Sequence, residues 1–143
     1  GPFTFVAADA LTMKVREGGR VVSCAVLVAT GVNNDGHREV LGVRVLTSET
    51  GPAWKEFFSD LVARGLTGVC LVTSDAHLGL VEAIAANLPG ATWQRCRTHY
   101  AANLMSVTPK ALWPAVKVML HSVRPARRRI GQRPIRPALG LRP

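Results

Sequence analysis

The sequence predicts an α/β protein built on one mixed β-sheet with flanking helices. Three observations lead to this class: extended apolar segments fill the first third of the chain, helical periodicity begins after Ser48, and strand-like and helix-like segments alternate from residue 69 onward. The chain has 143 residues, of which 48% are hydrophobic and 19% charged. This length is enough for one hydrophobic core, and this composition lies outside the range of disordered proteins.

Three strands are expected near the start of the chain. Residues 3–14 are rich in Phe, Val and Thr, residues 21–32 are almost continuously apolar, and residues 39–46 place alternate apolar side chains on one face. Residues that tolerate positive φ separate them, at Gly18-Gly19 and again at 33–36. The simplest arrangement is an antiparallel meander whose middle strand is the most buried.

Helices and further strands are expected after the meander. Apolar residues recur at helical spacing over residues 52–64, which predicts an amphipathic helix that covers the sheet: Trp54, Phe57, Phe58, Leu61 and Val62. The elements expected after it are a strand at 69–73, a helix closed by Pro89-Gly90, a short strand at 91–95, a helix at 97–106 and a helix beginning near Pro109 or Pro114.

The basic charge of the chain is concentrated at its end. The formal net charge is +9, but seven arginines and no acidic residue follow residue 123, which leaves 11 basic and 9 acidic residues, or +2, over residues 1–122. We interpret 123–143 as an Arg/Pro-rich disordered tail and 1–122 as the folded domain. The tail is either a basic arm for phosphate backbones or an out-of-frame product. No apolar run reaches the roughly 18 residues that cross a bilayer.

Cys96 and His99 form a Cys-x-x-His unit that resembles half of a zinc site. The other histidines and cysteines supply no second closely spaced pair, so zinc is not expected: His37, His77, His121, Cys24 and Cys70. A Cys-His nucleophilic pair lacks an evident third group that would orient it. A packing role for Cys96 remains the alternative. Three cysteines without a disulfide spacing favour a reducing cytoplasm.

Two aspartates are candidates for chemistry. Asp9 lies in an apolar strand, where Asp is disfavoured and calls for a partner or a ligand. Asp75 follows the strand expected at 69–73, and two carboxylates brought together there suit Mg²⁺ or Mn²⁺. The alternative for Asp75 is a structural one, the N-cap of the next helix.

Taken together, these segments resemble a known family over roughly residues 5–122. The segments are Asp9-Ala10, KVREGGRVV, VLVATGVNNDGHREVLG and LVTSDAHLGLVEAIAANLPGATWQRCRTHY. They are similar to the catalytic core of the Mutator-type bacterial insertion-sequence transposases. The resemblance implies a ribonuclease-H-like fold, in which a three-stranded antiparallel meander is joined by parallel strands.

The resemblance also implies an activity. Family members use an Asp-Asp-Glu triad with Mg²⁺ or Mn²⁺ to cleave and join DNA at terminal inverted repeats and target DNA. Asp9 matches the first catalytic and metal-binding Asp, Asp75 matches the second, and Cys96 and His99 match a Cys/Asp-x-x-His motif that supports the site. A homo-oligomeric parent protein in the bacterial cytoplasm, associated with the nucleoid and not with a membrane, is implied as well.

Four cations are candidate DNA contacts: Arg95, Arg97, Lys14 and Arg16. The two arginines flank Cys96 and could face phosphates, although a solvated surface role is equally compatible with their spacing.

The sequence departs from the family pattern at the third carboxylate. Glu82 is the only acidic residue after Asp75 and stands inside the next expected helix, whereas the family's Glu comes after the Cys-x-x-His motif. Asp35 and Asp60, in an expected turn and an expected helix, are poor substitutes. The Thr-Tyr that usually follows the first Asp is also replaced. We therefore expect a truncated or frame-shifted transposase core, catalytically incomplete alone. The alternative is a non-enzymatic, basic nucleic-acid-binding α/β domain.

Overall fold

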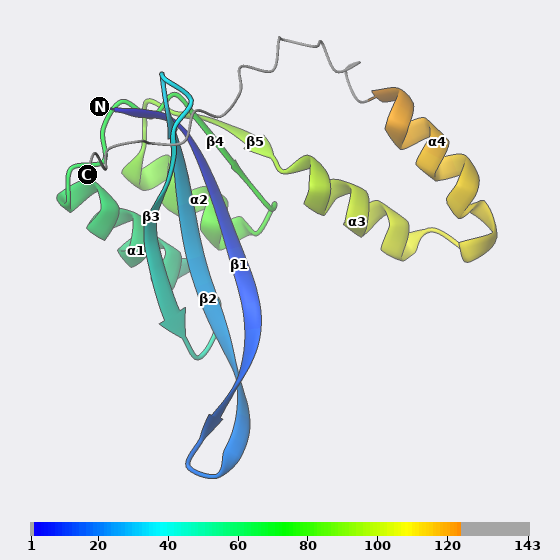
Figure 1. Cartoon of the computed structure of the whole chain (residues 1–143), viewed down its shortest axis with the longest axis horizontal. Helices are drawn as coiled ribbons and strands as arrows, with labels where there is room; N and C mark the ends of the chain where they lie inside the picture. Colours follow the sequence, from blue (N-terminus) through cyan, green and yellow to red (C-terminus); the bar gives the residue numbers. More distant parts are fainter. Residues whose placement is uncertain (1, 124–143) are drawn as a thin grey trace, which may run out of the picture. The chain divides into compact units, whose positions relative to one another are not determined.

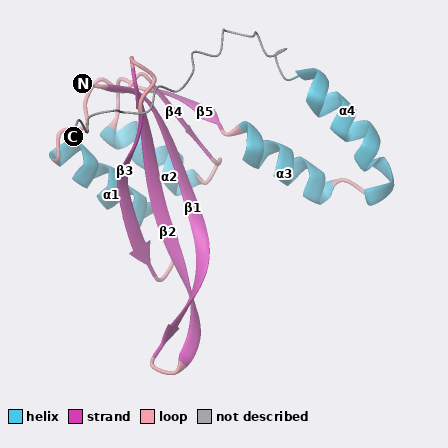
Figure 2. Cartoon of the chain, in the orientation of Figure 1, coloured by secondary structure: helices cyan, strands magenta, loops and turns pink. Residues whose placement is uncertain are grey.

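The structure, a computed structural model, describes residues 2–123. It confirms the mixed α/β class, with helices and strands alternating after an initial meander (Figure 1, Figure 2). The elements are β1 (Phe3–Glu17), β2 (Arg20–Asn33), β3 (Arg38–Leu46), α1 (Gly51–Ala63), β4 (Leu71–Ser74), α2 (Leu78–Asn87), β5 (Thr92–Arg95), α3 (Arg97–Val107), the 3₁₀ turn η1 (Lys110–Leu112) and α4 (Trp113–Val123).

One five-stranded sheet organises the first part of the chain, in the order β3-β2-β1-β4-β5. The meander is confirmed, since β1 pairs with β2 and β2 with β3 in antiparallel fashion. The turns are built where expected, with positive φ at Gly18, Gly19 and Gly36. Strand β4 then adds to the other side of β1 in parallel, and β5 adds in parallel to β4. The first strand is therefore the central one.

Helices α1 and α2 cover one face of this sheet (Figure 1). Alternate residues of β1, Val6 and Ala8, point into the core, as do Leu27 and Ala29 of β2 and Val72 of β4. The aromatic side chains of α1 fill the space against them: Trp54, Phe57 and Phe58. The amphipathic helix predicted over 52–64 is thus confirmed, because four of its five periodic apolar side chains are buried, whereas the fifth, Val62, is exposed.

The opposite face of the sheet is more open. Four of its apolar side chains in the meander are at least half exposed, with values of 51% for Leu11, 50% for Met13, 58% for Val43 and 60% for Val45. Asp9 belongs to this face, because side chains alternate along β1 and its neighbour Ala8 points into the core. The face without α1 and α2 is consequently the one that carries the candidate chemistry.

The chain divides into two compact units, with the boundary between Ala102 and Asn103 inside α3. In the second unit, the indole of Trp113 donates a hydrogen bond to the carbonyl of Thr108 at 2.9 Å, which anchors the start of α4. Among residues 2–123, no helix has the length and apolarity needed to cross a bilayer. Apart from Val123, the predicted tail lies outside the described residues.

Candidate active site

The parallel register of β1 and β4 brings the two aspartates together. Phe5 pairs with Leu71 and Ala7 with Thr73, and two further residues along each strand are Asp9 and Asp75. The paired segment ends at Ala7 and Thr73, and Asp75 follows the last residue of β4, so parallel pairing directs both aspartates to the same end of the two strands. Both residues are half-buried. Both lie near His99, because each of the two carboxylates raises the pKa of that imidazole.

Each carboxylate keeps one oxygen available. Oδ1 of Asp9 accepts a hydrogen bond from the amide of Ala10 at 2.8 Å, and Oδ1 of Asp75 accepts one from the amide of Ala76 at 2.8 Å. The second oxygen, Oδ2, accepts none from any residue in the described part of the chain. These local bonds fix the direction of each side chain and leave Oδ2 free for an external ligand.

Asp75 is not a helix cap, which corrects the structural alternative offered for it. The N-cap of α2 is His77, whose Nδ1 accepts a hydrogen bond from the amide of Leu80 at 3.2 Å. An N-cap side chain must reach the amides of the first helical turn, and Asp75 lies two residues too early to do so. Its carboxylate is therefore not used by the helix.

A buried hydrogen-bond network holds the end of β4 in place. Ser74 is fully buried, and its hydroxyl donates to the carbonyl of Asp75 at 2.8 Å. The same hydroxyl accepts a hydrogen bond from the indole Nε1 of Trp93, on β5, at 2.8 Å. The amide of Cys96 donates to the carbonyl of Ser74 at 2.6 Å. Strand β5 and the start of α3 are thereby fixed to the strand end that carries Asp75.

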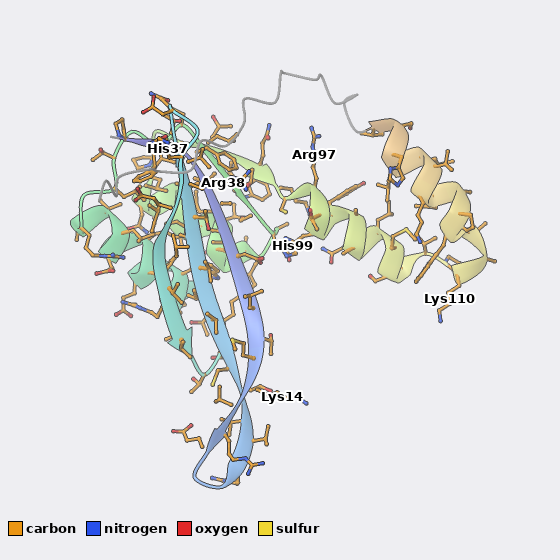
Figure 3. All side chains as sticks on the ribbon, viewed as in Figure 1. Lys14, His37, Arg38, Arg97, His99 and Lys110 are labelled. Carbon is orange, nitrogen blue, oxygen red and sulfur yellow. The ribbon has the colours of Figure 1, made fainter. Side chains whose placement is uncertain are left out.

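The Cys-x-x-His unit meets the first aspartate. His99 lies in the first turn of α3 (Figure 3), and its Nε2 is 3.3 Å from Oδ1 of Asp9. The side chain of Cys96 raises the pKa of His99, and the carboxylates of Asp9 and Asp75 raise it further. Burial opposes them without cancelling the increase. The contact with Cys96 falls short of a well-formed hydrogen bond, because the buried Nδ1 of His99 has no partner among the described residues.

The thiol of Cys96 is perturbed as well. Burial raises the pKa of Cys96, but the His99 amide, the nearby His99 imidazole and the Thr98 amide together outweigh burial and lower it below the ordinary value. The third group that the sequence did not reveal is Asp9, which contacts His99 from another strand. Cys96, His99 and Asp9 thus form one connected set.

The candidate DNA-binding cations lie in two places. Arg95, at the end of β5, stacks over the ring of Tyr100 with 5.2 Å between the guanidinium carbon and the ring centre. Arg97 begins α3 and is exposed, one residue beyond Cys96 (Figure 3). Lys14 and Arg16 are exposed on the far part of the β1–β2 hairpin, away from the aspartates.

The donor set suits a cation that retains water. Within residues 2–123, no three His, Cys, Asp or Glu side chains are grouped closely enough to hold an ion by themselves. Asp9 and Asp75 supply two carboxylates, and Mg²⁺ commonly binds through one or two carboxylates together with waters and substrate phosphates. Glu82 cannot contribute, because it is exposed on α2, which packs on the other face of the sheet. Two aspartates therefore fit Mg²⁺ in the presence of a phosphate ligand.

Sequence reasoning missed Ser74, Trp93 and His77. A signal existed for the first of them, because a Ser that ends an apolar strand and precedes a candidate metal ligand needs a hydrogen-bond partner if it is buried. The indole of Trp93 is that partner, and nothing in its sequence context identified it.

Comparison with known proteins identifies the family of the chain. Residues 1–128 match the family described as "Transposase, Mutator family". The transposase for insertion sequence element IS1081 of Mycobacterium tuberculosis is 66% identical over 123 residues, which cover 86% of this chain and 30% of that protein. The transposase for ISRM5 of Rhizobium meliloti is 47% identical over 109 residues, which cover 76% and 27%. The transposase for IS256 in transposon Tn4001 of Staphylococcus aureus is 41% identical over 108 residues, which cover 76% and 28%.

Among solved structures, the Drosophila P element transposase in a strand transfer complex aligns with a TM-score of 0.44 at 10% identity, covering 71% of this chain and 28% of that one. The chain spans about 30% of the length of the IS1081 transposase and similar fractions of the other two relatives. Because the family match extends over most of its residues, the chain belongs to the Mutator family of transposases.

Proposed function

We propose that this chain supplies the two-aspartate part of a metal-dependent, ribonuclease-H-like transposase core. Its DNA substrates would be the terminal inverted repeats of an insertion sequence and the target DNA, and its setting a homo-oligomer associated with the bacterial nucleoid. The observation that supports the proposal is the parallel β1–β4 register, which leads toward Asp9 on one strand and Asp75 on the other, together with His99, whose pKa both carboxylates raise.

Asp9 and Asp75 would hold Mg²⁺ or Mn²⁺ through their free Oδ2 atoms. When bound, such ions activate a water or a 3′-hydroxyl and stabilise the leaving oxygen of a phosphodiester. His99 would orient Asp9 through the 3.3 Å contact, and Cys96 would support the imidazole from its other side. Arg97 would meet phosphate oxygens close to the site, because charge-assisted bonds from Arg suit phosphates.

We further propose that these residues alone do not complete strand transfer. Two carboxylates stabilise the charge of the transition state less well than three, and each 1.36 kcal/mol lost is a tenfold lower rate. An assay with double-stranded oligonucleotides that carry inverted-repeat ends tests this point. Detectable joining of strands by this chain alone would contradict it.

Metal binding tests the site itself. Titration of the chain with Mn²⁺, followed by electron paramagnetic resonance, is expected to show binding that Asp9→Asn and Asp75→Asn each weaken strongly. Asp35→Asn is the matched control, because Asp35 lies in the β2–β3 turn. Equal binding by all the variants would refute the proposal. It would then favour the alternative, a basic nucleic-acid-binding domain without catalysis.

A further inference from the structure

The β1–β2 hairpin extends well beyond the rest of the sheet (Figure 1). Pairing of β3 with β2 ends at Ala25, and pairing of β4 with β1 ends at Ala7. Residues 13–24, here called the arm, therefore form a two-stranded ribbon without a third neighbour, closed by Gly18 and Gly19. A free ribbon of this kind gains little stability from the core, so its presence calls for a partner.

The two faces of the arm differ in character. On one face, Val15 pairs with Val22 and Met13 with Cys24, and three of these four side chains are half-buried. The other face carries Lys14 and Arg16, opposite Ser23 and Val21. The apolar face is partly covered by its own cross-strand pairs, whereas the cationic face is exposed throughout.

The cations of the arm are not neutralised by the protein. Lys14, Arg16 and Arg20 stand against a single acidic residue, Glu17, and none of the three cations forms an ion pair with another residue in the described range. By contrast, Arg44 and Arg64 elsewhere in the first unit pair with Glu56 and Asp60. Unpaired cations on an exposed ribbon are suited to a polyanion.

The arm and the aspartate site are parts of one strand. Lys14 and Arg16 lie five and seven residues after Asp9, which corresponds to about 17 and 23 Å at 3.3 Å per residue. Both offsets are odd, so in a flat strand the two cations would point away from the face of Asp9. Strands β1 and β2 cross at the base of the arm (Figure 1), which turns the arm relative to that face. The major groove also admits a two-stranded ribbon.

We propose that the arm binds the phosphate backbone of duplex DNA beside the bond held at Asp9, with Lys14 and Arg16 as the contacts. The proposal rests on the proposed function for its reference point, because it places the DNA relative to the aspartates. It deepens that function by naming a second DNA-binding element, the arm, which lies apart from the two aspartates. The arm thereby sets the path of the flanking DNA.

Duplex binding by the full chain, measured by fluorescence anisotropy in metal-free buffer at 50 to 200 mM KCl, tests the proposal. Lys14→Ala/Arg16→Ala is compared with Arg38→Ala/Lys55→Ala, which removes one lysine and one arginine from exposed positions elsewhere in the first unit. Two lost phosphate contacts lower the slope of log K against log salt by about 1.8. Raising KCl from 50 to 200 mM should therefore weaken DNA binding by wild type about twelvefold more than it weakens DNA binding by the arm variant. The control variant should keep the wild-type slope.

Cross-linking gives a second readout that does not depend on removing charge. A photoreactive p-benzoylphenylalanine in place of Val21, on the cationic face, should label the duplex, while the same residue in place of Val62 on α1 should not. Equal salt slopes for the arm variant and wild type, or equal labelling from the two positions, would overturn the proposal. It would also be overturned if the arm substitutions changed the oligomeric state, measured as molecular mass in solution, and left DNA binding unchanged. Equal Mn²⁺ binding by wild type, Asp9→Asn and Asp75→Asn, together with intact arm contacts, would refute the proposed function alone.

Discussion

The contact between α1 and α2 makes a sharp prediction about stability. A Cβ added to Gly79 would lie 2.5 Å from the Cα of Gly51 and 2.9 Å from its nitrogen. Carbon atoms in contact normally lie about 3.5–4.0 Å apart, so Gly79→Ala requires the helices to separate by about 1 Å. Overpacking of this kind costs about 1–3 kcal/mol, against a gain of at most about 1 kcal/mol from the helix propensity of Ala. We expect a net loss of about 1–2 kcal/mol.

Urea unfolding followed by circular dichroism measures this loss. With an m-value of about 2 kcal/mol/M, the midpoint should fall by about 0.5–1 M for Gly79→Ala. Two controls are available in the same chain. Gly90 has no atom within 4 Å of an added Cβ, and a Cβ on Gly51 would meet the Cα of Gly79 at 3.3 Å, so alanine at either position should cost much less. If Gly79→Ala proves as stable as Gly90→Ala, the close helix contact inferred here is wrong.

Three further predictions concern the core and the site. Trp93→Phe removes the 2.8 Å hydrogen bond to the buried hydroxyl of Ser74 and should cost about 1–3 kcal/mol in urea unfolding, and a double-mutant cycle with Ser74→Ala should show coupling between the two residues. The folded-state pKa of His99 is raised above 6.5, so the contribution of this residue to stability is complete below pH 6.5 and is lost as pH rises through the higher pKa. Asp9→Asn should shift the NMR titration of His99 to lower pH. An unshifted titration would contradict the contact between the two residues. Trp54→Ala should cost about 3–5 kcal/mol, because this fully buried ring stacks on a neighbouring ring and fills the space between α1 and the sheet; a change below 1 kcal/mol would contradict its central place in the core.

Much of the fold follows from local patterns. The meander is signalled by alternating strands and by glycines at the turns, and α1 by the spacing of its aromatic residues. The strand expected at 69–73 begins instead at Leu71 and ends at Ser74. Its start depends on pairing with β1 and β5, which are distant in sequence, and local hydrophobicity does not contain that information.

The site was predictable in its parts but not in its connections. Asp9 stands out as a charge in an apolar strand, and the expected pairing of its strand with the strand before Asp75 is confirmed. The contact between His99 and Asp9 joins residues 90 positions apart and depends on how α3 leaves β5. Because Asp is a common N-cap, the sequence also allows Asp75 to cap the next helix. In the structure the N-cap of α2 is His77.

The central position of β1 has a consequence for insertions and deletions. Side chains alternate between faces, so one residue inserted between Val6 and Asp9 would turn the carboxylate into the apolar layer with Leu27. Two inserted residues would return it to the open face but carry it about 7 Å past Asp75. Changes at the tip, Gly18-Gly19, alter only the reach of the arm. Within one strand, the segment before Asp9 therefore has a fixed length, whereas the arm can change length at its tip.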